Sequence, residues 1–252
     1  MARSNAAESS PHSSWIGMVT GRQRMLKSAL CGQCLSEESA AMADHPIFTE
    51  SIRRIRALLG ETDLDTLEQQ VLERLVHSSG DPGLMSLLQF SDGACACGVE
   101  ALTGKAVILT DTAMAAAAVS PMAARTLGNA VHCLLDWAPP LAPQGSTRSA
   151  AAMQRAWPEL SAAARASGSA LPLVLVGSAP TALEQLLDQV QAGADTPSLV
   201  IGMPVGFVGV PESKRRLAVS GLAQIRLEGT RGGAGLVAAA VNALLRAAQA
   251  AS

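Results

Sequence analysis

The chain has 252 residues, of which 48% are hydrophobic, and a formal net charge of −2 at pH 7. This length can bury a sizeable core, in one large α/β domain or in two small ones. Nucleic-acid binding depends on cationic surface and aromatic stacking, and is disfavoured by the near-neutral charge, the lack of a basic run and the scarcity of aromatic residues. We expect no apolar run long enough to span a membrane and no signal peptide. Five cysteines without framework spacing favour reduced thiols and a cytoplasmic location.

Residues 1–44 are rich in Ser and Ala and show no sustained hydrophobic periodicity, which predicts a disordered or poorly ordered extension. Cys31 and Cys34 form a single C-x-x-C pair in this segment, which we interpret as a coincidence because no βαβ pattern surrounds it. Met42 remains an alternative start of a shorter protein. The folded domain is expected over residues 45–252.

Two amphipathic helices are predicted at the start of this domain. The first covers residues 46–59, with an apolar side and a polar side that carries Ser51. The second begins after Asp65, whose carboxylate can accept hydrogen bonds from the first turn, and Glu68 three residues later completes a capping box. Gly80 is expected to end the second helix.

His77 lies in the last turn of the second predicted helix. The unpaired carbonyl groups at a helix C-terminus favour a positive charge, so we expect this position to favour the imidazolium ion. A histidine that holds a proton near neutral pH is a candidate general acid. A structural or C-capping histidine is the alternative interpretation.

From Lys105 onward, short β-branched runs alternate with helical segments. This alternation is typical of a parallel sheet covered by helices on both faces, in which ligands bind beyond the carboxyl ends of the strands. We expect Thr181 and Glu184 to form a capping box at the start of the helix over residues 180–193. The four predicted strands are 105–111, 171–177, 198–202 and 223–229, and helices follow each of them.

Arg148 follows a long Pro-rich connection, and either Ser146 or Thr147 can cap the helix that begins there. A cation in the first turn is unfavourable to the helix dipole, so Arg148 is a candidate for binding a ligand carboxylate. A solvated surface arginine is the alternative.

The segment GTRGGAG (229–235) lies between a predicted strand and a helix, which is the context of a phosphate-binding loop. Its spacing matches neither the dinucleotide fingerprint nor the Walker loop. Its N–H groups could bind a carboxylate, and close packing of helix against sheet is an equally good explanation. Ser178, His77 and Asp111 could form a hydrolase triad on paper, but VGSAP is not the required nucleophile elbow. The four histidines lack metal-ligand spacing, so no metal site is expected.

Taken together, six segments resemble the precorrin-8X methylmutase family of cobalamin biosynthesis. The combination of GMPVGFVG, ESK and the R-G-G segment in this order is specific, and the similarity runs from about residue 46 to 246. The segments are LVHSSGD (75–81), KAVILTDTAM (105–114), STRSA (146–150), VGSAPTAL (176–183), IGMPVGFVGVPESK (201–214) and EGTRGGAGLVAAAVNALL (228–245).

This resemblance implies a single α/β domain with three α/β/α layers and a mostly parallel sheet. It also implies an isomerase, a methylmutase that moves the C11 methyl of precorrin-8X or cobalt-precorrin-8 to C12 and gives hydrogenobyrinate or cobyrinate. His77 matches the family's catalytic histidine, which would protonate the macrocycle and promote a [1,5]-sigmatropic shift. The expected substrate-binding residues are Arg148, Ser51 and Thr147, together with the main chain at Gly206, Gly232 and Gly233.

The resemblance implies no cofactor and no metal. The expected partners are the tetrapyrrole substrate and further copies of the chain, in a homo-oligomer with the site near a subunit interface and a dimer favoured over a trimer. Neither nucleic acid nor a membrane is expected as a partner. Two other functions remain open: a non-catalytic corrinoid-binding or carrier protein, and a nucleotide-binding enzyme that uses residues 229–235.

Overall fold

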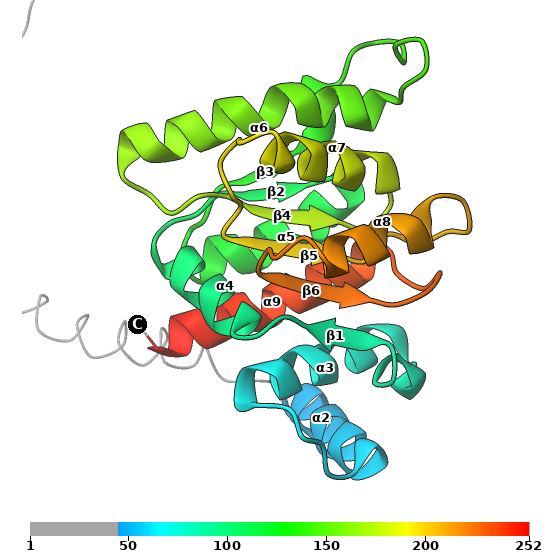
Figure 1. The fold of residues 1–252 in the computed structure, drawn as a ribbon. Helices are drawn as coiled ribbons and strands as arrows, with labels where there is room; N and C mark the ends of the chain where they lie inside the picture. The colour runs from blue at the N-terminus through cyan, green and yellow to red at the C-terminus, as the bar shows by residue number, and fades with distance from the viewer. Residues whose placement is uncertain (1–44, 252) are drawn as a thin grey trace, which may run out of the picture. The chain divides into compact units, whose positions relative to one another are not determined.

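One six-stranded sheet runs through the protein, and helices cover both of its faces (Figure 1). The computed structural model describes residues 45–251. The strands are β1 (Leu88–Phe90), β2 (Ile108–Thr110), β3 (Val131–Cys133), β4 (Leu173–Val176), β5 (Leu199–Gly202) and β6 (Gln224–Leu227). Their order is β1-β6-β5-β4-β2-β3, in which β1 is antiparallel to β6 and every other pair is parallel.

The helices lie in two layers, one on each face of this sheet. In Figure 1, α6, α7 and α8 lie on one face, and α9 crosses the other. The helices are α2 (Pro46–Leu59), α3 (Thr66–Ser79), α4 (Ala94–Thr103), α5 (Ala113–Arg125), α6 (Arg148–Ser167), α7 (Pro180–Gln191), α8 (Val210–Ala218) and α9 (Ala234–Ala251), with the short 3-10 helices η1 (Pro82–Leu84) and η2 (Leu134–Trp137).

The predicted fold class, a three-layer α/β/α domain with a mostly parallel sheet, is confirmed. All four predicted strands are present as β2, β4, β5 and β6, although each is shorter than its predicted range. The two edge strands β1 (LQF) and β3 (VHC) were not predicted, because neither lies in a longer β-branched run such as the one that contains β2. Helix α4 was also not predicted, since its small residues (ACACGVEALT) give no clear apolar stripe.

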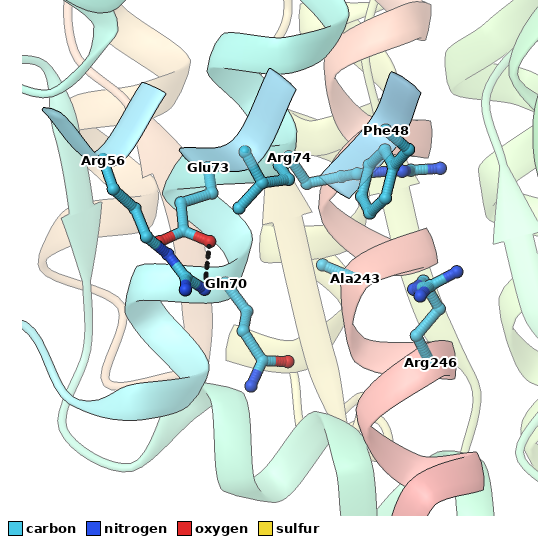
Figure 2. Close-up of a pocket in the computed structure, with 8 residues that line it drawn as sticks. Phe48, Arg56, Gln70, Glu73, Arg74, Ala243 and Arg246 are labelled. Atoms are coloured by element: carbon cyan, nitrogen blue, oxygen red, sulfur yellow. Dashed lines mark hydrogen bonds and ion pairs between the residues drawn. The ribbon is translucent and has the colours of Figure 1, made fainter. Parts of the chain in front are cut away.

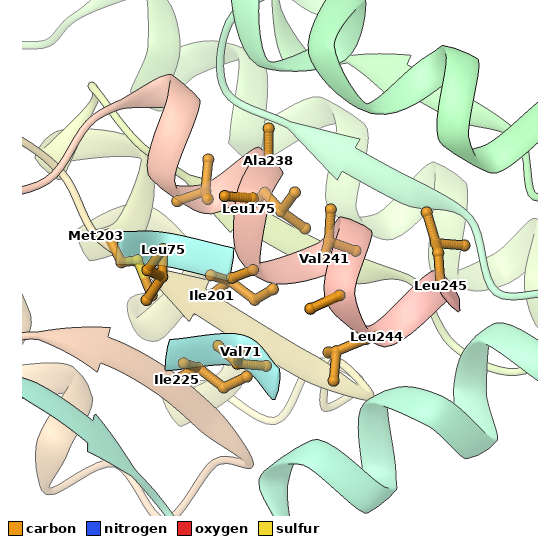
Figure 3. Close-up of a cluster of buried hydrophobic side chains, with 14 of the residues drawn as sticks. Val71, Leu75, Leu175, Ile201, Met203, Ile225, Ala238, Val241, Leu244 and Leu245 are labelled. Carbon is orange, nitrogen blue, oxygen red and sulfur yellow. The ribbon is translucent and has the colours of Figure 1, made fainter. Parts of the chain in front are cut away.

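The core consists of two apolar clusters, one on each face of the sheet. Alternate residues of a strand point to opposite faces. In β4, Leu173 and Leu175 accordingly belong to the cluster under α9, whereas Val174 and Val176 belong to the cluster under α6 and α7. Figure 3 shows the first cluster, in which side chains of α9 pack over the central strands. Both faces of the central strands are therefore buried, as a parallel sheet requires.

Helix α9 corrects one expectation from the sequence. Among the described helices it alone is long and apolar enough to cross a bilayer, by length and composition, whereas we had expected no such run. Its buried residues include Val237, Val241, Leu244 and Leu245, and they pack on the sheet and the neighbouring helices. The apolar character of α9 is thus that of a core helix.

Helix α3 has the predicted caps at both ends. Asp65 accepts hydrogen bonds from the N–H groups of Leu67 (2.7 Å) and Glu68 (2.9 Å), and the Glu68 carboxylate accepts one from the Asp65 N–H (3.1 Å). At the other end Gly80 adopts the left-handed conformation (φ 69°), which glycine reaches without strain. These caps fix where the helix ends, and therefore where His77 lies.

Replacing Asp65 with alanine is expected to lower the free energy of unfolding by about 0.5–2 kcal/mol, because two N–H groups of the first turn lose their acceptor. Urea denaturation followed by circular dichroism measures the change. Glu68→Gln is the control, since glutamine retains an acceptor for the Asp65 N–H and should have a smaller effect. Equal losses in the two variants would contradict this account of the cap.

The N-terminus of α7 is capped differently from our prediction. No side chain of α7 caps it; instead, Asp111 at the carboxyl end of β2 accepts hydrogen bonds from the N–H groups of Gly177 (3.0 Å), Ser178 (2.6 Å) and Ala179 (2.8 Å). The two residues of the predicted capping box have other partners, Thr147 for Thr181 and Arg216 for Glu184. The predicted capping box is therefore wrong, because a carboxylate from a distant part of the sequence occupies this helix end.

Candidate active site

His77 is exposed at the C-terminal end of α3, and two residues of α2 hold its ring. Its Nδ1 lies 2.8 Å from the Ser51 hydroxyl oxygen. The Phe48 ring packs against the imidazole at 83° between planes, with 5.1 Å between the ring centroids. Within residues 45–251 no hydrogen bond engages the other ring nitrogen, Nε2. The imidazole is thus oriented through Nδ1, and Nε2 is the atom available to a ligand.

A cavity of about 160 Å³ lies beside Phe48, between α2, α3 and α9 (Figure 2). The guanidinium carbons of Arg74 and Arg246 lie 4.9 and 5.4 Å from the centroid of the Phe48 ring, which places both cations against it. The cavity is lined by Phe48, Ile52, Arg56, Gln70, Glu73, Arg74, Ala243 and Arg246. Three arginines and one glutamate contribute to these walls, so their charge is net positive and the cavity suits an acidic group.

Arg56 belongs to this wall but has an internal partner. It forms a two-point ion pair with Glu73, at 2.7 and 3.0 Å, and the Glu73 side chain is only 4% exposed. The pair joins α2 to α3 and compensates a buried carboxylate, which would otherwise be costly. We therefore assign Arg56 to the structure of the α2–α3 pair, while Arg74 and Arg246 line the cavity against the Phe48 ring.

The electrostatic environment of His77 contradicts the expectation from the sequence. Partial burial lowers the pKa of His77 below its usual value, and the positive charge of Arg74 lowers it further. Arg74 lies three residues before His77, on the same face of α3. Both effects disfavour the imidazolium ion, whereas the helix C-terminus alone had been expected to favour it.

Replacing Arg74 with glutamine is expected to raise the pKa of His77, because a positive charge that disfavours the imidazolium ion is removed. Titration of the His77 ring by NMR spectroscopy measures this pKa directly, without substrate. Arg125→Gln, at the far end of α5, is the control and should leave the titration unchanged. An unchanged or lower pKa in the Arg74 variant would contradict the assignment.

The loops after β5 and β6 contact each other through their main chains. The Gly206 N–H donates to the Thr230 carbonyl (3.1 Å), and the Gly233 N–H donates to the Met203 carbonyl (2.9 Å). A Cβ atom at Gly232 would lie 2.0 Å from the Met203 carbonyl oxygen, so only glycine permits this approach. The Gly233 N–H is thus not available for a carboxylate, as we had expected it to be, and substrate binding by the main chain at Gly232 and after Gly206 remains a proposal.

The loop over residues 229–233 also differs from a phosphate-binding loop in the direction of its carbonyl groups. The carbonyls of Gly229 and Arg231 accept hydrogen bonds from the Lys214 ammonium group. A phosphate-binding loop instead directs free N–H groups at its ligand. The observed geometry supports the packing explanation for GTRGGAG and gives no support to nucleotide binding.

Arg148 lies in the first turn of α6, as predicted, and Thr147 is its N-cap. The Thr147 hydroxyl accepts a hydrogen bond from the Ala150 N–H (3.1 Å) and lies 2.7 Å from the Thr181 hydroxyl. The Arg148 side chain is exposed, and its Nε donates to the Pro139 carbonyl (2.8 Å). This contact ties the guanidinium group to the Pro-rich loop that precedes α6.

The structure brings some of the candidate residues together and separates others. Ser51 and His77 are in direct contact, whereas no hydrogen bond or ion pair joins His77 to Arg148 within the described chain. Figure 1 shows α3 beside β1 and α6 at the opposite, β3 side of the sheet. Contacts between loops connect the two regions. Asp81, after α3, forms an ion pair with Arg231 (2.9 Å), and the loop that contains Arg231 contacts the loop after β5.

Two alternative sites receive no support. The Asp111 carboxylate accepts main-chain N–H groups through one oxygen, and its other oxygen is buried without a partner, so it does not orient His77 as a triad requires. No group of three or more His, Cys, Asp or Glu residues in the described part of the chain could hold a metal ion. The C-x-x-C pair at Cys31 and Cys34 lies outside the described residues.

Sequence reasoning missed three residues around His77: Phe48, Arg74 and Arg246. The spacing of Arg74 from His77 on one helix was a usable signal, because residues three apart share a face. Phe48 was assigned to the buried side of its helix, and nothing local in the sequence connects Arg246, on α9, with α3. Only the packing of α9 against α3 brings this second arginine to the cavity.

Comparisons with known proteins agree with this architecture. A family model described as Precorrin-8X methylmutase matches residues 46–247. The Precorrin-8X methylmutase of Pseudomonas aeruginosa is 39% identical over 203 residues (79% of this chain and 93% of that protein), and the Cobalt-precorrin-8 methylmutase of Synechocystis is 33% identical over 216 residues (80% and 95%). A crystal structure of the precorrin-8x methyl mutase of Thermus thermophilus superposes with a TM-score of 0.68 and 36% identity, covering 81% of this chain and 96% of that one. The chain therefore belongs to the precorrin-8X methylmutase family, a family of isomerases.

Proposed function

We propose that this protein is a methylmutase that moves the C11 methyl group of precorrin-8X or cobalt-precorrin-8 to C12, giving hydrogenobyrinate or cobyrinate. The observation that carries the proposal is the Ser51–His77 pair, whose imidazole packs on Phe48, a residue that lines a cavity edged by arginines, in a chain of this family. Both substrates are included because the relatives carry both names.

His77 acts as the general acid in this proposal. The Ser51 hydroxyl can accept a hydrogen bond from Nδ1–H, both in the imidazolium ion and in the neutral ring that remains after Nε2 has given up its proton, so the ring keeps its orientation in both charge states. The proton at Nε2 passes to the macrocycle, whose ring system becomes electron-poor, and this lowers the barrier to methyl migration. A lowered pKa makes the imidazolium ion a stronger acid but a scarcer one at neutral pH.

Arginines bind the acidic side chains of the substrate in this proposal. Arg74 and Arg246 take a carboxylate at the cavity, and Arg148 takes another at the loop before α6. A carboxylate beside Arg74 also offsets the charge that lowers the pKa of His77. Substrate binding therefore promotes protonation of the catalytic histidine, because it introduces negative charge next to it.

The proposal is tested by incubating the purified protein with metal-free precorrin-8X and, separately, with cobalt-precorrin-8. Absorption spectroscopy follows the change from the precorrin to the corrin chromophore. Repeated turnover with either substrate supports a methylmutase. Tight retention of one equivalent without turnover would instead indicate the alternative, a non-catalytic corrinoid-binding or carrier protein.

We also propose a homo-oligomer, with a dimer favoured, whose subunit interface lies near the site. The support is the separation of His77 from Arg148 within one chain, because one large ligand would have to reach both. Sedimentation or light scattering with and without substrate tests the assembly. A cytoplasmic location is proposed on the free thiols of Cys95, Cys97 and Cys133.

A further inference from the structure

Lys214 of α8 is a buried cation that the proposed reaction does not use. Its side chain is 2% exposed, and its Nζ donates hydrogen bonds to the carbonyls of Gly229 (2.9 Å) and Arg231 (2.6 Å). Both acceptors belong to the loop between β6 and α9. One ammonium group thus binds two main-chain carbonyls of this loop.

The ammonium group of Lys214 has no carboxylate partner in the described part of the chain, whereas arginines of α8 and β6 pair with acidic residues. Arg215 pairs with Glu212, Arg216 with Glu184 and Asp188, and Arg226 with Glu228. Burial without such compensation lowers the pKa of Lys214 to about 8. A buried charge of this kind is costly to the fold, so general stability does not explain it.

The loop that Lys214 holds also contacts the end of the His77 helix. Arg231 forms an ion pair with Asp81 (2.9 Å), and the Asp81 carboxylate accepts a hydrogen bond from the Gly83 N–H (2.9 Å). Asp81 lies four residues after His77, directly beyond the C-cap of α3. Both members of the ion pair are substantially exposed, so it contributes little to stability. Instead, the ion pair fixes the position of the turn at Gly80 and Asp81 that follows α3.

We propose that Lys214 is a positioning residue for His77, acting through the loop at 229–231 and the Arg231–Asp81 ion pair. The inference rests on the proposed function for its consequence in turnover, but the placement of His77 is measurable without any substrate. A displacement of about 1 Å in a catalytic group can cost about 10²-fold in rate, so a modest shift of this turn is enough to matter.

Lys214→Met is the test variant, because methionine retains length and apolar volume but has no donor. We expect its melting temperature to be maintained, since removal of the cost of burying the charge offsets the loss of the hydrogen bonds to the Gly229 and Arg231 carbonyls. We expect the NMR titration of His77 to change and kcat to fall by up to about 10²-fold. Lys105→Met is the matched control, because Lys105 also donates to a carbonyl, that of Leu127, but far from the site.

Asp81→Asn supplies the second part of the test, as a double-mutant cycle with Lys214→Met. If both residues act through one loop, the double variant loses little more activity than either single variant, and the His77 titration shifts alike in all three. Independent, multiplicative losses would overturn the proposal, as would a wild-type His77 titration in folded Lys214→Met. Because NMR needs no substrate, a failure of methylmutase activity alone would leave this test intact.

Discussion

Replacing His77 with glutamine is expected to lower kcat by about 10²–10⁴-fold, the usual contribution of a general acid. Glutamine retains polarity and similar size but cannot deliver a proton from the position of Nε2. Tetrapyrrole binding should be largely preserved, because the arginines of the cavity are unchanged. Turnover assays and substrate titration measure the two effects separately.

His132→Gln is the matched control for this variant. His132 lies on the edge strand β3, where its ring contacts Trp137, and it is outside the proposed site. We expect near-normal kcat in this control. Normal turnover by the His77 variant would refute the acid-catalysis mechanism, whatever the assignment of the family.

Replacing Gly232 with alanine is expected to destabilise the protein by about 1–3 kcal/mol or more, the range for forced overpacking. The added Cβ would lie 2.0 Å from the Met203 carbonyl oxygen, and main-chain atoms cannot move aside as a flexible side chain can. The loops after β5 and β6 must then separate, so activity should fall as well. Denaturant unfolding and turnover assays measure both losses.

Gly235→Ala is the matched control, in the first turn of α9. A Cβ atom there meets no atom within 4 Å, and alanine is a better helix former than glycine. We expect unchanged or increased stability in this variant. If the two alanine variants unfolded at the same denaturant concentration, the close contact at Gly232 would not limit stability.

The parts of the site that depend on local sequence were predictable. The capping box at Asp65 and the glycine at position 80 defined α3 within a residue at each end, and Thr147 capped the helix that carries Arg148. Such signals involve residues within one helical turn, so a single segment contains all the necessary information. The alternation of strands and helices likewise predicted β2, β4, β5 and β6, but not the edge strands β1 and β3.

The parts that depend on distant residues were not predictable. Arg246 reaches the cavity only because α9 packs on α3, and Asp111 caps α7 although 66 residues separate it from Gly177. The pKa of His77 was assigned the wrong direction because burial of the ring, the larger cause of the lowered pKa, depends on tertiary packing. These features depend on tertiary packing, which a local sequence pattern does not predict.

The position of Asp111 has a consequence for the selectivity of the protein. The start of a helix at the carboxyl edge of a parallel sheet is where many α/β proteins receive the phosphates of nucleotides and sugars. Here the chain's own carboxylate already binds the N–H groups of Gly177, Ser178 and Ala179 in the turn that leads into α7. These N–H groups therefore do not bind a phosphate, and a ligand at this edge of the sheet must be recognised by other groups.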